Sequence, residues 1–296
     1  MGGAGFAVSH QSILKMLKTS ITLSLLVPTV VWAQCQTYVV PGTQGGFTQR
    51  SFTNFSSGTP SQNALEFLDA HGFYASAYPI DATPISREFT QDNVNFGTGA
   101  LNLKVNAYSG SGPVIGAEIG TLEQFLYGSV RTVQRSSSVP GVVEGNFFYS
   151  EASYNFQAPM IDYAFTESNT QEIDFEILTS TIFTSTQACV PPGIWASNQP
   201  STRATILFPF DPRTAFHEYR IDWFPGVTIF YLDGTQVARF TTDVPNVSGP
   251  WLWNVWSSGD VCWSAGPPTA DSITQIRSID IYKGYTQTVS GTVCQI

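Results

Sequence analysis

The chain has 296 residues, a formal net charge of −9 and a hydrophobic fraction of 42%, with 14% aromatic residues. This length is sufficient for one large all-β domain. The negative charge argues against nucleic acid and anionic membrane surfaces as partners, whereas a neutral polysaccharide is compatible with it.

The first 33 residues resemble a secretion leader in composition. Two lysines, Lys15 and Lys18, precede the apolar run 21–31, and the small residue Ala33 ends a sequence that a signal peptidase could read. The apolar run is too short to span a bilayer. We therefore expect a signal peptide over residues 1–33, with possible extra residues at its N-terminus.

The expected mature domain covers residues 34–296, and Met16 is the better start because a charged beginning, an apolar middle and a cleavage site all follow it. Without the leader, 11 basic residues face 22 acidic ones, a formal charge of −11. Asn54 and Asn246 begin N-x-S sequons, which predict glycosylation outside the cell. Residues 291–296 contain no long apolar tail. We expect a freely secreted, extracellular monomer that needs no cofactor.

All four cysteines follow the expected cleavage site, and an even number in a secreted chain indicates two disulfides. Three pairings are possible. We favour Cys35 with Cys294, because the ends of a sandwich often meet, and Cys189 with Cys262, which would join two loops. No CxxC pair occurs and the chain has only three histidines, so no metal site is expected.

In chain order, residues 36–58 are expected to supply a strand near the termini, and 62–71 is the one segment with helical spacing. Short alternating segments follow from Phe89 onward, separated by turns. We expect strands at 101–105, 127–134, 141–149, 171–178, 216–224, 227–232, 236–240, 251–257 and 273–282.

The three strands between residues 216 and 240 are joined by Pro-Gly and Asp-Gly turns and predict an antiparallel meander. Residues 150–170 and 184–201 are expected to be long connections of the kind that often face substrate. So many turn-separated strands predict an all-β fold, a two-sheet antiparallel β-sandwich of jelly-roll type.

The segment 171–178 alternates acidic and apolar residues, which places Glu172, Asp174 and Glu176 on one face of a strand. Carboxylates about 7 Å apart raise one another's pKa. One interpretation is a solvated outer face that keeps the sheet soluble. The other is glycosidic bond cleavage, which with retention needs a nucleophile and an acid roughly 5 to 5.5 Å apart. Alpha carbons at i and i+4 lie roughly 13 Å apart on a flat strand, a gap that a twisted sheet could close.

Several blocks resemble, in the same order, glycoside hydrolase family 16, the group of lichenases, laminarinases and fungal cell-wall transglycosylases. The likeness covers most of residues 101–282 and is closest to secreted fungal members. The matching blocks are 116–118, 127–128, 172–176, 216–223, 230–234 and 244–256.

This resemblance implies a concanavalin A-like jelly roll and assigns roles to the matching residues. Glu172 would be the nucleophile, Glu176 the general acid and base, and Asp174 the residue that orients Glu172. Trp256 would stack on a sugar ring, and Glu118 would hydrogen-bond substrate hydroxyls.

The tryptophans also allow a structural interpretation. Trp256 could pack in the core beside Trp251 and Trp253, because we expect all three on one face of their strand. Trp195 and Trp263 are expected in loops, where they could flank the substrate or serve packing.

Three further positions bear on the resemblance. His217 begins a strand, and we expect a structural role because the acids already account for the chemistry. Arg131 and Val133 stand where many family members carry Glu and Arg, which predicts a difference in the residues that contact substrate.

Three functions remain open at this point. The first is a secreted retaining hydrolase that cleaves internal β-1,3 or mixed β-1,3/1,4 linkages of glucan. The second is a cell-wall glucan or chitin transglycosylase of the same family. The third is a carbohydrate-binding, lectin-like sandwich without catalysis, since a fold alone does not decide function.

Overall fold

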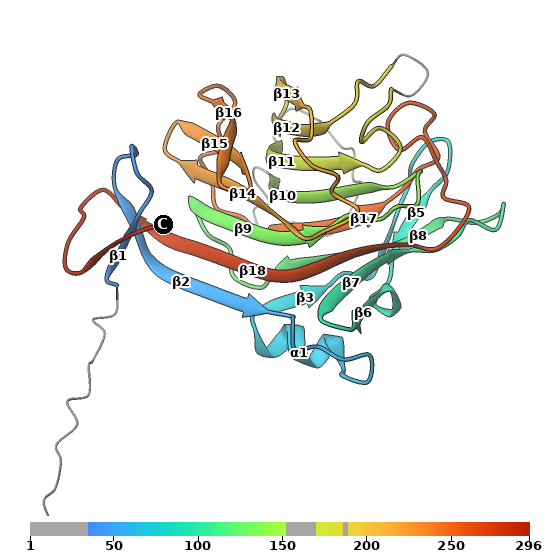
Figure 1. Ribbon diagram of the computed structural model, residues 1–296, viewed down its shortest axis with the longest axis horizontal. Helices are drawn as coiled ribbons and strands as arrows, with labels where there is room; N and C mark the ends of the chain where they lie inside the picture. Colours follow the sequence, from blue (N-terminus) through green and yellow to red (C-terminus); the bar gives the residue numbers. More distant parts are fainter. Residues whose placement is uncertain (1–34, 152–169, 186–188) are drawn as a thin grey trace, which may run out of the picture. The chain divides into compact units, whose positions relative to one another are not determined.

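The computed structural model describes residues 35–151, 170–185 and 189–296. The expected leader and most of the 150–170 connection lie outside these residues. The described part of the chain folds into two stacked β-sheets with one short α-helix and one 3-10 helix (Figure 1).

One sheet has nine described strands, and all of its pairings are antiparallel except that between β5 and β8. Its order is β13 (Thr202–Ile206), β12 (Ile194–Asn198), β11 (Thr170–Leu178), β10 (Val143–Glu151), β17 (Trp251–Trp256), β8 (Val114–Thr121), β5 (Arg87–Phe89) and β4 (Tyr78–Ile80), with β3 (Phe73–Ala75) also on β8. The segment with three acids is β11, near one edge of this sheet.

The other sheet has ten described strands, and its one parallel pairing joins β1 and β19 at the two ends of the described chain. Its order is β16 (Thr235–Phe240), β15 (Val227–Leu232), β14 (His217–Phe224), β9 (Gly128–Arg135), β18 (Ser272–Thr286), β2 (Gly46–Asn54), β1 (Thr37–Val39) and β19 (Val293–Gln295); β7 (Ala100–Val105) pairs with β18, and β6 (Val94–Gly97) with β7.

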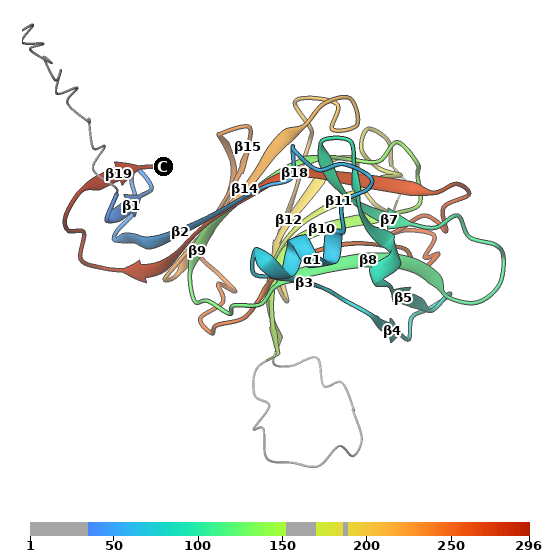
Figure 2. The same ribbon diagram turned by 90° about the horizontal axis from the view of Figure 1, so that it is seen from below.

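The α-helix α1 (Ala64–Ala70) lies beside β3 (Figure 2). The Asn63 side chain caps it by accepting hydrogen bonds from the backbone N–H groups of residues 65 and 66. Ala64 and Leu68 are buried in the main core. The 3-10 helix η1 (Gln91–Asn93) leads into β6.

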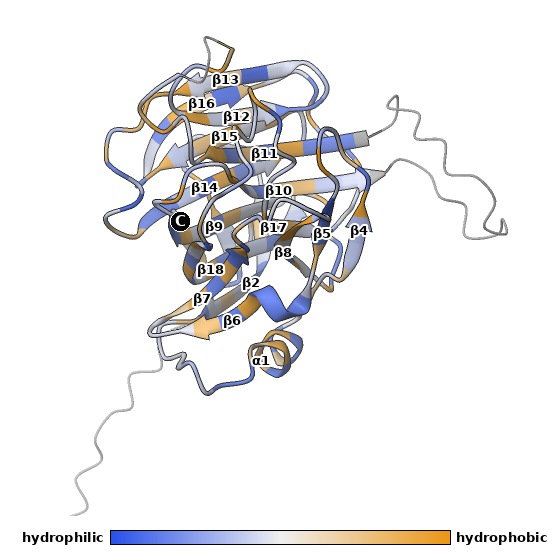
Figure 3. Cartoon of the chain, turned by 90° about the vertical axis from the view of Figure 1, so that its right-hand side faces the viewer, coloured by the Kyte–Doolittle hydropathy of each residue, from blue (hydrophilic) through white to orange (hydrophobic). Residues whose placement is uncertain are grey.

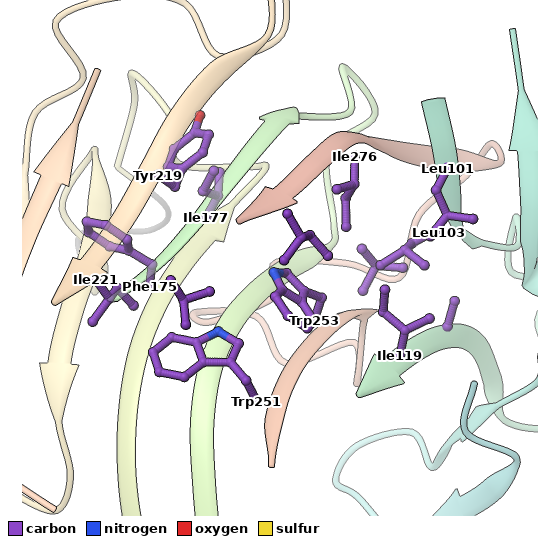
Figure 4. Close-up of a cluster of buried hydrophobic side chains, with 14 of the residues drawn as sticks. Leu101, Leu103, Ile119, Phe175, Ile177, Tyr219, Ile221, Trp251, Trp253 and Ile276 are labelled. Carbon is purple, nitrogen blue, oxygen red and sulfur yellow. The ribbon is translucent and has the colours of Figure 1, made fainter. Parts of the chain in front are cut away.

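The core fills the space between the two sheets (Figure 4). Every second residue of β11 and β17 points into it, among them Ile173, Phe175, Trp251 and Trp253. Each large side chain buried in this way stabilises the fold by roughly 1.5–3 kcal/mol. Hydrophilic and hydrophobic residues accordingly alternate along many strands (Figure 3). This inward packing fixes the direction of the intervening residues, including the three acids of β11.

The predicted all-β sandwich is confirmed, as are the meander β14–β15–β16 and the short helix. Both predicted disulfides are present, Cys35–Cys294 and Cys189–Cys262. The expectation that 184–201 is only a connection is wrong, because β12 lies within it. The sheets are also not purely antiparallel, because β1–β19 and β5–β8 pair in parallel.

Candidate active site

The outer face of the nine-stranded sheet carries the three acids. On β11, Ile173, Phe175 and Ile177 belong to the core, so Glu172, Asp174 and Glu176 project from the opposite side. We call this outer side the acidic face. Glu172 and Glu176 are half-buried and Asp174 is buried, so the solvated outer face considered from the sequence does not describe this site.

Asp174 interacts electrostatically with both Glu172 and Glu176. Its Oδ2 accepts hydrogen bonds from Ser197 Oγ at 3.0 Å and Gln199 Nε2 at 3.4 Å. Burial, and then the negative charges of Glu172 and Glu176, raise the pKa of Asp174 well above its ordinary value. Both effects favour the protonated form of Asp174, which donates a hydrogen bond to Glu172.

That hydrogen bond distinguishes Glu172 from Glu176. Burial raises the pKa of Glu172, and the hydrogen bond with Asp174 works in the opposite direction. For Glu176, burial and the charge of Glu172 raise the pKa to about 7, although a hydrogen bond with Trp263 and the charge of Arg87 lower it. The Asp174 hydrogen bond thus limits the rise in the pKa of Glu172, while Glu176 is the carboxyl that holds its proton near neutral pH.

Aromatic residues lie on the β12 side of the acids. Trp195 is the register partner of Glu176, and its ring centroid lies 5.0 Å from that of Trp263. Trp263 belongs to the loop after β17, which the Cys189–Cys262 disulfide ties to the segment before β12. A second, smaller apolar cluster lies beneath this loop; we call it the satellite core, and it consists of Val143, Leu178 and Val190 with Trp195, Trp256, Cys262 and Trp263 packed on it.

Polar residues lie on the opposite side, toward β8. Glu118 is buried and accepts hydrogen bonds from Ser76 Oγ at 2.7 Å, Tyr78 OH at 2.9 Å and Asn254 Nδ2 at 3.2 Å. Burial raises the pKa of Glu118, and these hydrogen bonds lower it. Asn254 is the register partner of both Glu118 and Gly145, and Gly145 is in turn the partner of Glu176. Glu118 therefore lies in one row with the proposed acid.

Gly145, the register partner of Glu176, has no side chain that would fill this row. A Cβ atom at this position would lie 2.6 Å from Asn254 Oδ1, closer than real Cβ atoms approach. A side chain here would displace Asn254 or cover the floor between Glu176 and Asn254.

Two expectations about tryptophans are wrong. Trp251 and Trp253 are buried in the core, but Trp256 has the opposite parity and lies on the acidic face, where it is half-buried. Trp195 is not in a loop, because it belongs to β12. Trp263 is in a loop, as expected.

Arg131 and Val133, whose identities predicted a difference in the residues that contact substrate, do not lie on the nine-stranded sheet that carries the three acids. Both belong to β9 in the ten-stranded sheet. The Arg131 guanidinium carbon lies 5.1 Å from the ring centroid of Tyr282 on the neighbouring strand β18 of that sheet.

His217 lies on β14, also in the ten-stranded sheet, and its Nδ1 is 2.7 Å from Asp233 Oδ2. Its ring stacks on Phe210 with centroids 3.5 Å apart. These contacts agree with the structural role expected from the sequence. Asn54 and Asn246, the predicted glycosylation sites, are exposed.

Sequence reasoning missed several residues of the acidic face. Ser197 and Gln199 contact Asp174 only because β12 pairs with β11 in one particular register. Asn254 has the right parity on β17 to be found by counting from the buried Trp253. Arg87 belongs to a three-residue strand that carries too little pattern to be recognised.

Within the described ranges, no group of three or more His, Cys, Asp or Glu residues is arranged to hold a metal ion. None of the helices in that part of the chain is long and apolar enough to cross a membrane.

A sequence profile named Glycosyl hydrolases family 16 matches residues 82–252, more than half of the chain. The chain belongs to this family. The resemblance stated from the ordered sequence blocks is therefore confirmed, and the profile also covers β5, which lies before residue 101.

Proteins of known name are similar in sequence to this chain over part of their length. A β-glucanase of Paenibacillus polymyxa is 26% identical over 171 residues, which cover 57% of this chain and 64% of the relative. The Arabidopsis thaliana protein named "Probable xyloglucan endotransglucosylase/hydrolase protein 21" is 27% identical over 207 residues, 61% of each chain. The chain thus spans less than two thirds of the length of these relatives.

The solved structure of a Bacillus licheniformis β-glucanase has the same fold, with a TM-score of 0.60 at 16% sequence identity. The superposition covers 79% of this chain and 98% of the β-glucanase.

Proposed function

We propose that this chain is a secreted, retaining glycoside hydrolase that cleaves internal β-1,3 or mixed β-1,3/1,4 linkages of glucan. The observation that carries the proposal is the acid trio of β11. Glu176 has a pKa of about 7 and can donate a proton, while Glu172, four residues away on the same face, accepts a hydrogen bond from Asp174. Two carboxyls with divided roles are what retaining cleavage requires.

In the first step, the Glu172 carboxylate attacks the anomeric carbon as the bond to the leaving oxygen breaks. The proton of Glu176 moves to that oxygen, so the leaving sugar departs with a hydroxyl group. A covalent ester joins the remaining sugar to Glu172.

In the second step, Glu176 is a carboxylate and takes a proton from water. The water oxygen attacks the anomeric carbon, the ester bond breaks, and Glu172 is released as a carboxylate. The pH profile should be bell-shaped, because Glu172 must be ionised and Glu176 protonated in the first step. Activity should fall as the pH rises past about 7, where Glu176 loses its proton.

The test measures new reducing ends from laminarin, lichenan, xyloglucan and chitin oligomers. We expect activity on laminarin or lichenan, and loss of at least about a hundredfold in Glu172→Gln and Glu176→Gln, the low end of what a positioned acid or base contributes. Glu66→Gln on the exposed surface of α1 is the matched control and should keep wild-type activity.

Two results would count against this function. Near-full activity in either active-site variant would remove its assigned role. A first-formed product of inverted anomeric configuration, seen by NMR, would exclude the ester on Glu172. Tight glucan binding without new reducing ends would instead identify a binding protein.

Transfer to a sugar acceptor is the second candidate. It uses the same first step, but an acceptor hydroxyl replaces water in the second. The Arabidopsis relative carries both activities in its name, which favours this possibility. Mass spectrometry of products separates the two, since oligosaccharides longer than the starting material indicate transfer.

A further inference from the structure

Arg87 is a half-buried arginine on the acidic side of the nine-stranded sheet. It lies on β5, which runs parallel to β8 with Arg87 opposite Val114. Its guanidinium carbon is 3.9 Å from the centroid of the Trp256 ring. A cation this close to an indole is attracted by the negative face of the ring. Arg87 therefore covers one face of Trp256, the residue that the sequence suggested as a stacking platform.

Among the described residues, no carboxylate lies in direct contact with the Arg87 guanidinium. The ion pairs of the described residues join other groups, although Glu118 and Glu176 both lie near enough to act on its pKa. Glu118 instead accepts hydrogen bonds from three neutral donors, of which Tyr78 is one. A purely structural arginine in this position would be expected to pair with Glu118.

Two buried polar atoms on this side lack a hydrogen-bond partner among the described residues, Arg87 Nε and Asn254 Oδ1. Leaving such a group unpaired destabilises the folded protein. One atom is a donor and the other an acceptor. The terminal Nη atoms of Arg87 are not among these buried unpaired atoms, so a sugar hydroxyl can accept a hydrogen bond from them.

We propose that Arg87 is a substrate-binding residue that donates hydrogen bonds to the hydroxyl groups of a neutral glucan on the Glu118 side of β11. This inference depends on the proposed function. Because the Arg87 guanidinium covers this face of the Trp256 indole, a sugar cannot stack on it there. The sugar is instead recognised through hydrogen bonds to its hydroxyl groups. A neutral sugar is expected because Glu172 must be ionised in the proposed first step, and its charge would repel an anionic sugar.

The kinetic test compares wild type with Arg87→Met and Arg87→Lys on lichenan and laminarin at pH 5, where Glu176 stays protonated. Methionine keeps an unbranched side chain on Trp256 but has no N–H groups. We expect KM to rise about tenfold in Arg87→Met, with kcat changed less than about threefold, because the lost hydrogen bonds from the charged guanidinium stabilise the bound substrate and the transition state alike. Lysine keeps the charge without the planar group and should give an intermediate KM.

The matched control is Arg50→Met on β2 of the ten-stranded sheet. It also removes an arginine that stacks on aromatic rings, here Phe52 and Tyr282, and it breaks an ion pair with Asp280. Its KM should equal that of wild type.

A binding measurement keeps the inference separate from catalysis. Calorimetry with a mixed-linkage tetrasaccharide on Glu172→Gln, with and without Arg87→Met, should show about a tenfold weaker Kd in the double variant. If wild type releases no reducing ends from any glucan, the proposed function fails. If wild type is active and Arg87→Met keeps the wild-type KM and Kd, the role of Arg87 is overturned. A loss confined to glucan oxidised to carry carboxylates would overturn the neutral-sugar assignment.

Discussion

Glu172 and Glu176 are the same amino acid on the same strand, and their neighbours give them different affinities for a proton. Glu172 receives a hydrogen bond from Asp174, which favours its anion. Glu176 experiences the negative charge of Glu172 in addition to burial, which brings its pKa to about 7. The proposed division of labour between nucleophile and acid therefore depends on Asp174, whose own burial favours its protonated form.

Trp263 offers a way to move the pKa of Glu176 without touching a carboxyl. The indole hydrogen bond stabilises the ionised form of Glu176 and so lowers its pKa. Trp263→Phe removes the N–H and should raise that pKa above about 7. Glu176 would then remain protonated to higher pH, and the alkaline limb of kcat/KM should move upward. A pH profile between 4 and 9 measures this shift.

Trp195→Phe is the control for that experiment. Trp195 packs on Trp263, but its Nε1 has no hydrogen-bond partner among the described residues. This variant removes a similar N–H from the same aromatic pair and should leave the alkaline limb where it is. An equal shift in both variants would assign the effect to packing.

At single residues, alternation predicted the shared face of the three acids but not their partners. The period of two is a local property of β11, so it can be read from the sequence. The contact of Ser197 with Asp174 depends on strand register, and the stacking of Arg87 on Trp256 joins strands far apart in the chain. Trp256 itself could have been placed correctly, because its parity differs from that of Trp253.

Among the strands, β10 separates two kinds of acid environment. Gly145 and Phe147 face the acidic side, whereas Glu144 points between the sheets and is buried. Its carboxyl accepts hydrogen bonds from the Ser137 N–H, Gln134 Nε2 and Thr274 Oγ1. Burial raises the pKa of Glu144 despite these donors. The neutral form is thus favoured in the folded protein.

Glu144→Gln should weaken the pH dependence of stability. Glu144 binds a proton more tightly in the folded protein than in the unfolded chain, because its folded-state pKa is the higher of the two. The resulting stabilisation of the fold is complete below the unfolded pKa of about 4.5 and is lost as the pH rises through the folded-state pKa. Glutamine cannot ionise, so its Tm should fall less than that of wild type between pH 4.5 and 8. Calorimetric scans across this range measure the difference. Other buried acids remain, so part of the dependence should persist.

Glu66→Gln serves as the reference variant in the same scans, because Glu66 is exposed on α1. It should follow the wild-type curve. Parallel curves for wild type and Glu144→Gln would show that Glu144 does not contribute to the pH dependence.

Element prediction succeeded where turns were explicit and failed where strands were short. The Pro225-Gly226 and Asp233-Gly234 turns mark the meander clearly. The strands β3 to β5 have three residues each, too few for a period to emerge. The strand β12 was missed because prolines and a disulfide cysteine before it suggested an irregular loop.

Across the whole molecule, the two disulfides hold different parts of the fold, one the paired strands β1 and β19 and the other the loop that carries Trp263. Cys35–Cys294 joins residues 259 apart in sequence and fastens β1 beside β19 in the ten-stranded sheet. Cys189–Cys262 spans 73 residues and holds the loop that carries Trp263 over the satellite core. Cys35–Cys294 closes the longer loop and so constrains the unfolded chain more. Cys189–Cys262 also positions Trp263, which hydrogen-bonds Glu176.

Removal of each disulfide should therefore give different results. The double variant Cys35→Ser, Cys294→Ser should lower the free energy of unfolding by about 2–4 kcal/mol and keep wild-type kcat/KM in the folded protein. Cys189→Ser, Cys262→Ser should lower kcat/KM as well and move its alkaline limb upward, because Trp263 loses its anchor. Urea denaturation and pH profiles at 20 °C measure the two effects. Equal kinetic loss in both variants would contradict this division.

The acidic face is also asymmetric about β11. On one side, β12 presents the indole of Trp195; on the other, beyond β10, lie Asn254, Glu118 and Arg87. A β-glucan has unlike reducing and non-reducing ends, so a chain laid across these strands can match the two surfaces in one orientation only. In the proposed function, the direction in which the polymer binds is thus decided by the order of strands in a sheet, before any bond to the sugar is made or broken.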